Sequence, residues 1–400
     1  MRPIFAREPI SSGYAWSAKA LTLHRFILRF AFGATQIYAW IFVFEYFRFV
    51  GQAFDESFVR TILLYTLSQT ITCLFTPYAA RFLRHGSRRL LIVGTSLAAV
   101  ALVVLNATFS GAWFVVAVSG SIVTFAVLMG LYRALYWIPY EVEFEAEGRR
   151  AVSLFTHVAV ASGPLLGGLI IAGYVQGPSL LLYGGAALLA LSTIPLLFAR
   201  DIHEKYSWGY RETFRKLFDS EYLPIVRESF FDGISGVTLV FFWPLAVYFI
   251  VGNSYAVLGL ILTASFIITF VMRSTIRRLL IRMRPSDSPL VIATFAASPW
   301  LLKLLVATPA GVIFVDSYFY TTRRHTMSVD PFAFEQAADG SKYVDEFTAL
   351  KEVALALGRI TACLLVALVA SFASVLSALV FVVLAAALSS VVVALWAQAK

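Results

Sequence analysis

Several ionisable side chains lie inside long apolar stretches of the chain, where charged residues are rare. They include Glu45, Arg133, Asp232, Asp316 and Arg359, and His157 is a further ionisable group in such a stretch. If the stretches are membrane helices, each charge costs about 2.5–3.5 kcal/mol at the helix centre, so it is expected to face a polar cavity or a partner. A carboxylate in a dehydrated cavity can exchange a proton, and an arginine can bind an anionic group.

These properties assign provisional roles. We expect Asp316, with Asp232 or Glu45, to take up and release protons. We expect Arg133 and Arg359 to bind an anionic group on a solute, or to act as counter-charges to the acids. Three alternatives stay open: Glu45 and Asp232 could be interfacial, Arg133 could snorkel to a membrane surface, and Asp316 and Arg359 could form a purely structural buried pair.

Aromatic side chains accompany one of the arginines. Tyr136, Trp137 and Tyr140 follow Arg133 by three, four and seven residues, a spacing that places all four on one helix face. Such a face could stack on an aromatic or anionic solute, or pack as a gate. With Gln36, which lies in the first apolar stretch, Arg133, Tyr136 and Trp137 complete the predicted solute-binding set.

Other chemistry finds little support in the sequence. No GxxxxGK[ST] stretch that would cradle a nucleotide is present, and the five histidines and two cysteines show no metal-ligand spacing. Glu141, Glu143, Glu145 and Glu147 alternate with apolar residues beside two arginines, which favours a salt-bridge network over catalysis. We therefore expect no enzyme activity, no metal and no cofactor.

Composition indicates where these residues reside. The 400-residue chain is 60% hydrophobic and only 14% charged, with a mean hydropathy of +0.80, whereas soluble chains have about 45–50% apolar and about 25% charged residues. A lipid bilayer as solvent explains both departures. The net charge of +9 is expected to set membrane topology rather than to bind nucleic acid.

Apolar runs long enough to span a bilayer, about 20 residues each, occur about twelve times. Most lysines and arginines fall in alternate connections, which predicts that both termini are cytoplasmic, and the outer connections hold little more than Arg48, Arg60 and Lys303. The predicted spans are 26–47, 59–80, 89–108, 113–138, 151–173, 179–198, 225–250, 254–273, 289–306, 310–327, 347–371 and 375–397.

A charged stretch near the middle of the chain divides these spans. The sequence predicts an all-α membrane protein with two pseudo-repeated six-helix bundles, residues 1–198 and 223–400, joined by a cytoplasmic linker, residues 199–222. Basic loops follow the second and the eighth spans alike. Repeated halves are common in secondary transporters, whose solute site lies near the midplane between them.

Two motifs make the chain similar to the major facilitator superfamily over nearly its whole length. Gly163-Pro164-Leu165-Leu166-Gly167-Gly168 in the fifth span resembles the GPxxGG core of the family's antiporter motif. The loop from Ala79 to Arg89, with Gly86 at the turn and Arg88 beside it, resembles the family's GxLaDRxGrR loop. Gly163, Pro164, Gly167, Gly168, Gly86 and Arg88 are accordingly expected to serve gating or packing.

Two departures mark a divergent member. Ala79 stands where the family has its first glycine, and Leu83 stands where it has an aspartate that is linked to a charge relay at the cytoplasmic gate. The resemblance also implies that spans 1, 4, 7 and 10 line the central cavity. Glu45, Arg133, Asp232 and Asp316 lie in these four spans, although the pattern was not used to place the spans, and Arg359 lies in the eleventh.

The function expected from this reading is secondary transport of a small organic solute by alternating access, with proton-coupled antiport as the favoured coupling. Uncoupled transport or uptake of an organic anion is one alternative. A transport-fold lipid flippase or a non-transporting sensor or partner is another. We expect a monomer in a bacterial-type inner membrane, with the solute, protons and lipid as its partners and no nucleic acid.

Overall fold

The computed structural model describes residues 12–109, 115–147, 159–282, 288–322 and 344–399, and every regular element in these ranges is a helix. The first half of the chain contributes α1 (Ser12–Phe49), α2 (Phe54–Phe82), η1 (Leu83–His85), α3 (Ser87–Phe109), α4 (Val115–Glu147), α6 (Gly163–Gly173) and α7 (Gly177–Leu196). The second contributes α8 (Tyr210–Lys216), α9 (Leu223–Val237), η2 (Thr238–Phe242), α10 (Trp243–Ile250), α11 (Tyr255–Arg282), α12 (Pro289–Lys303), α13 (Pro309–Thr322), α14 (Val344–Phe372) and α15 (Val375–Ala399).

Local sequence explains several helix boundaries. Asp55 and Glu56 stand in the first turn of α2, where negative charge is favourable for the helix dipole. Gly86 has a φ of 107°, a conformation that suits glycine, and it turns the chain between η1 and α3. η2 is a five-residue π-helix that continues α9 directly into α10. Pro244, which has no N–H to donate, is the second residue after the π-helix.

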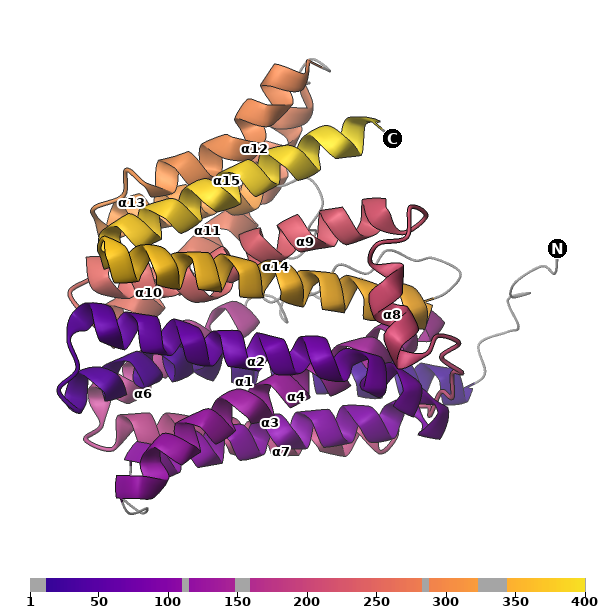
Figure 1. The fold of residues 1–400 in the computed structure, drawn as a ribbon. Coiled ribbons are helices and arrows are strands. Elements are labelled where there is room, and N and C mark those ends of the chain that lie inside the picture. Colours follow the sequence, from indigo (N-terminus) through magenta and orange to yellow (C-terminus); the bar gives the residue numbers. More distant parts are fainter. Residues whose placement is uncertain (1–11, 110–114, 148–158, 283–287, 323–343, 400) are drawn as a thin grey trace.

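The helices of the two halves of the chain lie on opposite sides of the molecule (Figure 1). We call α1 to α7 the N-half and α9 to α15 the C-half. Within the N-half, α3 packs on α4 and α7, and within the C-half, α9 packs on α14 and α12 on α15. Across the halves, α2 packs on α14 and α6 on α11. The two halves therefore meet chiefly along these two helix pairs, with smaller contacts of α4 with α14 and of α1 with η2.

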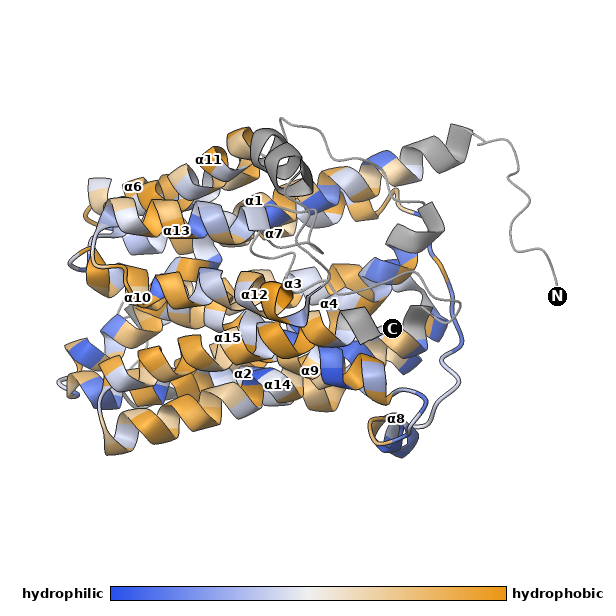
Figure 2. Cartoon of the chain, turned by 90° about the horizontal axis from the view of Figure 1, so that it is seen from above, coloured by the Kyte–Doolittle hydropathy of each residue, from blue (hydrophilic) through white to orange (hydrophobic). Residues whose placement is uncertain are grey.

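Nine helices among the described residues are long and apolar enough to cross a membrane, and Ala159–Gly173 and α12 are shorter apolar helices. Apolar residues run along the helices, and polar residues gather at the two ends and in α8 (Figure 2). Each of the twelve predicted ranges overlaps helical chain. The predicted fifth span is described only from residue 159 and the tenth only to residue 322, and His157, which was weighed as a polar group of the fifth span, lies outside the described residues.

Two ends of the molecule matter below. The linker end is the one at which α8 lies, together with the C-terminal end of α15 (Figure 1). The opposite end carries the connections from α1 to α2 and from α10 to α11. Large apolar side chains such as Val100, Leu191 and Leu388 are exposed along the helices, as expected where lipid covers the surface.

Candidate functional site

A buried ion pair joins two neighbouring helices of the C-half. The ammonium of Lys303 at the end of α12 pairs with one carboxylate oxygen of Asp316 on α13. The indole Nε1 of Trp243 in α10 donates a 3.0 Å hydrogen bond to the other oxygen. The two charged side chains are 0% and 2% exposed. We call Trp243, Lys303 and Asp316 the charge cluster.

Aromatic rings surround the ammonium of this cluster. The Nζ atom of Lys303 lies 3.8 Å from the ring centroid of Trp243 and 5.1 Å from that of Phe319. A cation over an aromatic face is stabilised by the ring quadrupole, most strongly where water is excluded. Taking two ions out of water costs several kcal/mol each, so the carboxylate and the rings are needed to hold this lysine inside.

Lys303 was not among the residues expected at the site. In the sequence it ends an apolar run, which indicates a side chain that snorkels to the interface. The sequence spacing could have predicted this pair. Lys303 and Asp316 flank a short connection between two apolar runs, and a tight helical hairpin would bring the two side chains to similar depth in the membrane.

Arg359 lies elsewhere, at the contact between the halves. It is 2% exposed on α14, and its Nη1 donates a 3.2 Å hydrogen bond to Oε1 of Gln69 on α2. Asp316 has Lys303 and Trp243 as its partners. The structure thus separates the two residues that were considered as a possible buried pair, and gives each a different polar partner.

The predicted aromatic face of α4 is buried. Arg133 is 3% exposed, and the ring of Tyr136 stacks on that of Tyr140 with centroids 5.5 Å apart. The hydroxyl of Tyr136 is hydrogen-bonded to Nε2 of His24 on α1 at 3.1 Å. Trp137 is 5% exposed, and its indole N–H has no hydrogen-bond partner among the described residues.

The other polar residues expected at the site are dispersed. Gln36 on α1 is buried, and Asp232 on α9 is half-buried. Glu45 is half-buried near the opposite end of α1, where its Oε1 accepts a 3.3 Å hydrogen bond from the hydroxyl of Tyr248 on α10. None of these three joins the charge cluster, whose carboxylate is bonded to Lys303 and Trp243.

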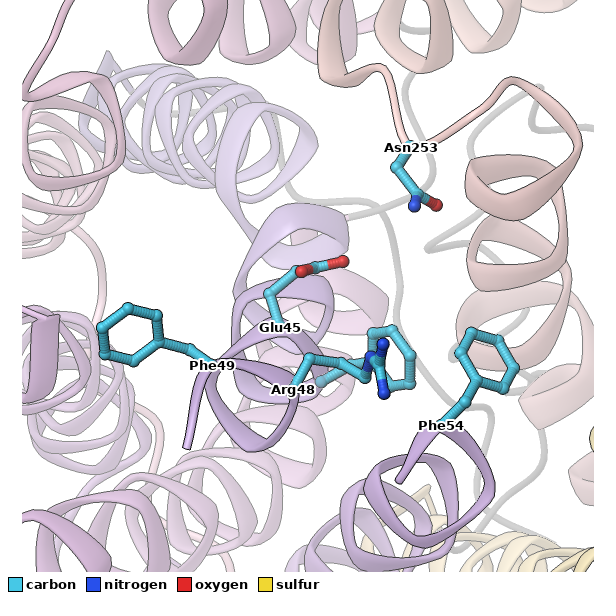
Figure 3. Close-up of a pocket in the computed structure, with 6 residues that line it drawn as sticks. Glu45, Arg48, Phe49, Phe54 and Asn253 are labelled. Atoms are coloured by element: carbon cyan, nitrogen blue, oxygen red, sulfur yellow. The ribbon is translucent and has the colours of Figure 1, made fainter. Parts of the chain in front are cut away.

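Glu45 borders an open pocket of about 370 Å³ at the opposite end of the molecule. Figure 3 shows Glu45 and Arg48 on one helix, with Asn253 facing them across the opening. Phe44, Phe49 and Phe54 complete the lining. The guanidinium of Arg48 lies 5.8 Å from the ring centroid of Phe54 and donates to the carbonyl of Gln52.

Beneath this pocket, aromatic side chains of both halves pack together. Tyr65 on α2 stacks on Phe241 of the π-helix with ring centroids 4.5 Å apart, and Trp40 on α1 meets the same ring edge-on at 5.8 Å. Closer to the end of the molecule, Phe249 contacts Phe44 and Phe54 at 5.2 and 5.1 Å. We call Trp40, Tyr65 and Phe241 the aromatic cluster. It joins α1 and α2 of the N-half to η2 of the C-half.

The Gly-Pro motif lies between α1 and α11. A Cβ atom on Gly163 would come within 2.9 Å of the backbone of Gly33, and one on Gly167 within 2.6 Å of the ring of Tyr38. The carbonyl of Pro164 accepts a 2.5 Å hydrogen bond from the hydroxyl of Tyr38. A Cβ on Gly168 would come within 2.8 Å of that hydroxyl oxygen. Small residues thus allow three helices to approach closely.

Gly86 and Arg88 lie at the linker end. A Cβ atom on Gly86 would come within 2.6 Å of the carboxylate of Asp201. The same carboxylate accepts a 3.1 Å hydrogen bond from the backbone N–H of Arg88 and lies 3.6 Å from its guanidinium. Among the described residues, no group of three or more His, Cys, Asp or Glu side chains could hold a metal ion.

Comparison with known proteins places the fold. No family model matches the chain, and no curated protein matches it. Among solved structures, a D-xylose–proton symporter has a TM-score of 0.60 at 14% identity, over 95% of this chain and 97% of its own. A POT family transporter in complex with 5-aminolevulinic acid has a TM-score of 0.58 at 11% identity, over 94% of each chain. The nucleoside transporter NupG has a TM-score of 0.56 at 16% identity, over 98% of this chain and 100% of its own.

These likenesses extend over nearly the full length of every chain compared. The chain therefore has the major facilitator superfamily fold of these transporters, as its motifs predicted, and the nine long apolar helices among its described residues make it a multi-pass membrane protein. At these levels of identity the comparison establishes the fold, and the chemistry has to be argued from the chain's own residues.

Proposed function

We propose that the protein is a secondary transporter that moves a small organic solute across the membrane by alternating access. The observation that carries the proposal is the fold, which three solved transporters share over at least 94% of this chain. The contacts of α2 with α14 and of α6 with α11 support it, because two halves that meet along helix pairs can rock against each other.

In this proposal residues 1–198 and 223–400 form two six-helix bundles, and residues 199–222 are the linker between them. The linker end is cytoplasmic. Basic residues support that orientation: Arg81, Arg84 and Arg89 lie at the linker end, and Arg48 and Arg60 at the other. The membrane is an inner membrane and the transporter is a monomer.

Proton coupling in this proposal operates through the charge cluster. A carboxylate that shares a dry site with an ammonium can release it by taking up a proton, and the freed ammonium can then bind an anionic group. Intramembrane ionisable residues commonly mark such pathways. The full burial of Lys303 and Asp316 supports this role. Antiport is the mode of coupling that the Gly-Pro motif and the intramembrane carboxylates favour.

The test is a reconstitution in proteoliposomes. Small organic acids, amines, sugars and nucleosides are first screened for thermal stabilisation of the purified protein, since a bound ligand stabilises the folded state. Solute flux and internal pH are then followed together. Asp316→Asn is expected to abolish solute-driven proton movement. Glu56→Gln, which removes a carboxylate from an exposed ion pair with Arg60 at 2.6 Å, is the matched control. Unchanged proton movement in Asp316→Asn would refute the coupling.

A second candidate is uncoupled transport of an organic anion. The buried Arg359 supports it, because this guanidinium lies at the contact of the two halves, where its Nη1 donates to Gln69. Arg359→Ala would then abolish anion flux and leave any proton dependence unchanged, whereas the exposed Arg60→Ala would leave both unchanged. Lipid flipping needs a lateral opening, and the packing of α2 on α14 and α6 on α11 favours solute transport instead.

A further inference from the structure

The first part of the linker is fastened to the N-half. Asp201 binds the backbone N–H and the guanidinium of Arg88 at the start of α3. The backbone of Ile202 exchanges two hydrogen bonds with Ser87: its carbonyl accepts from the Ser87 N–H at 2.8 Å, and its N–H donates to the Ser87 hydroxyl at 2.9 Å. The Ser87 hydroxyl in turn donates to Glu143 on α4.

The next part of the linker is fastened to the C-half. Both the backbone N–H and the hydroxyl of Ser207 donate to Oε1 of Glu346, at 3.0 and 2.6 Å. Glu346 lies in the first turn of α14 and is 5% exposed. Beyond it, α8 packs on both α2 and α14. Seven residues of linker, from 201 to 207, thus connect the start of α3 in the N-half to the start of α14 in the C-half.

Apolar side chains under this segment also come from both halves. One buried cluster contains Leu83 and Ile138 of the N-half, Ala349 of the C-half and Tyr206 of the linker, with Ile202 packed against it. Leu83 is fully buried. It stands at the position where the resembling family has its aspartate. The apolar residue thus fits the cluster that the linker completes.

We propose that residues 199–209 are an inner strap, which holds the cytoplasmic ends of the two halves together in place of the aspartate relay. Opening the solute path to the cytoplasm requires the bonds between Ser207 and Glu346 to break, because they are the part of the strap that crosses from one half to the other. The inference rests on the proposed function, since a strap has this role only if the halves separate.

The chain contains its own reporter of that separation. Cys73 on α2 is 5% exposed and lies in a buried cluster with Leu350 and Val353 of α14 and with Leu217, which follows α8. Release of the strap would uncover this thiol to water at the linker end. Cys363 is fully buried on α14 and can be replaced by alanine, which leaves Cys73 as the only cysteine.

The experiment measures the rate at which a membrane-impermeant maleimide alkylates Cys73 in inside-out vesicles. Glu346→Gln and Ser207→Ala are expected to raise the rate, by about tenfold for the first, because losing a hydrogen bond to a charged group shifts a two-state equilibrium by about that factor. Glu204→Gln is the matched control. Glu204 is exposed in the same segment, so its loss of charge should leave the rate unchanged. Rates for Glu346→Gln and Ser207→Ala equal to that of the control would overturn the inference.

A third variant separates the strap from the family's relay. Leu83→Asp restores the family's residue but puts a carboxylate into the apolar cluster. If the inner strap holds the halves together, Leu83→Asp should disrupt the apolar cluster and Cys73 should be alkylated faster than in the parent protein. If the aspartate instead restores the family's relay, Cys73 should be alkylated more slowly. The elution profile and the unfolding temperature show whether Leu83→Asp folds. If it does not, the alkylation rates of Glu346→Gln and Ser207→Ala test the strap. The alkylation experiment needs no solute, so its result does not depend on the transport assay. The inner strap can be confirmed when no transported solute is found, and transport can be confirmed when the strap is refuted.

Discussion

The charge cluster gives the sharpest energetic prediction. Lys303→Met and Asp316→Asn each remove one member of an ion pair whose side chains are 0% and 2% exposed. Breaking a buried pair in this way costs about 3–5 kcal/mol, because the remaining charge is left buried without compensation. Lys303→Met also loses the contact with the Trp243 ring at 3.8 Å, which is worth up to about 2 kcal/mol where water is excluded.

The double variant is expected to behave differently. Lys303→Met with Asp316→Asn leaves no charge in the cluster, and the asparagine can still accept the hydrogen bond from the indole of Trp243. Replacing a buried ion pair by neutral groups of similar size is often close to neutral, so we expect a cost of about 0–2 kcal/mol. The two single variants together cost about 6–10 kcal/mol, which predicts a coupling energy of at least about 4 kcal/mol.

The assay is a double-mutant cycle on the free energy of unfolding in mixed detergent micelles, followed by tryptophan fluorescence. The exposed pair Glu56 and Arg60, with side chains 47% and 46% exposed, is the control. Its coupling is expected to be about 0.3–0.5 kcal/mol, as for other exposed helix pairs. Single variants at Lys303 and Asp316 that each cost less than about 1 kcal/mol, with additive effects, would show that the pair is not desolvated.

Three further predictions concern packing, the aromatic cluster and the linker. Gly167→Ala should lower the unfolding free energy by about 1–3 kcal/mol, because a Cβ there meets Ala34 and Tyr38; Gly184→Ala, with open space around it, should not lower it. Phe241→Ala should lower it by about 3–5 kcal/mol, because a buried aromatic ring is lost, whereas Tyr65→Phe keeps the stack at 4.5 Å and should cost less. Asp219 has a pKa held below its ordinary value of 3.8 by the backbone N–H of Glu221 and by the ammonium of Lys216. The contribution of the Asp219 carboxylate to stability is thus present above its unfolded pKa and is lost as the pH falls through its folded pKa. Asp219→Asn should therefore be less stable than the wild type at neutral pH, and the two should become equally stable once the pH is below the folded pKa.

The helices and the family fold could be predicted from the sequence because the bilayer imposes a simple rule on it. An apolar run of sufficient length has to form a helix, since only a helix satisfies its own backbone in lipid. The Gly-Pro motif predicted close packing, and the structure gives the neighbours that need it, Gly33 and Tyr38. The span count and the membrane orientation stay predictions.

The partners of the buried charges could not be predicted in the same way. Arg359 meets Gln69 across the contact between the halves, and the two are 290 residues apart. No local pattern encodes such a contact. The burial of Lys303 depends on how α12 packs on α13. The apolar runs of the sequence give only approximately how deep in the membrane the lysine side chain lies. The roles proposed for Arg133, Tyr136, Trp137 and Arg359 in solute binding stay predictions.

The loop around Leu83 illustrates a third case. The sequence indicates that an aspartate of the family's loop is missing, but it does not show what takes its place. The structure brings Asp201, Ile202 and Tyr206 of the linker against this loop. The linker was expected only as a connection between halves, because charged residues of both signs are typical of a solvated segment.

Alternating access is tested most directly by distances between the halves. With the two native cysteines replaced by alanine, spin labels at the exposed positions Phe49 and Leu305 report on the end opposite the linker, and labels at Phe82 and Met272 report on the linker end. Alternating access predicts two distance populations for each pair of labels in lipid nanodiscs. A change of pH that lengthens the distance at one end should shorten the distance at the other. A single unchanged distance at both ends, under all pH values and solutes tried, would contradict it.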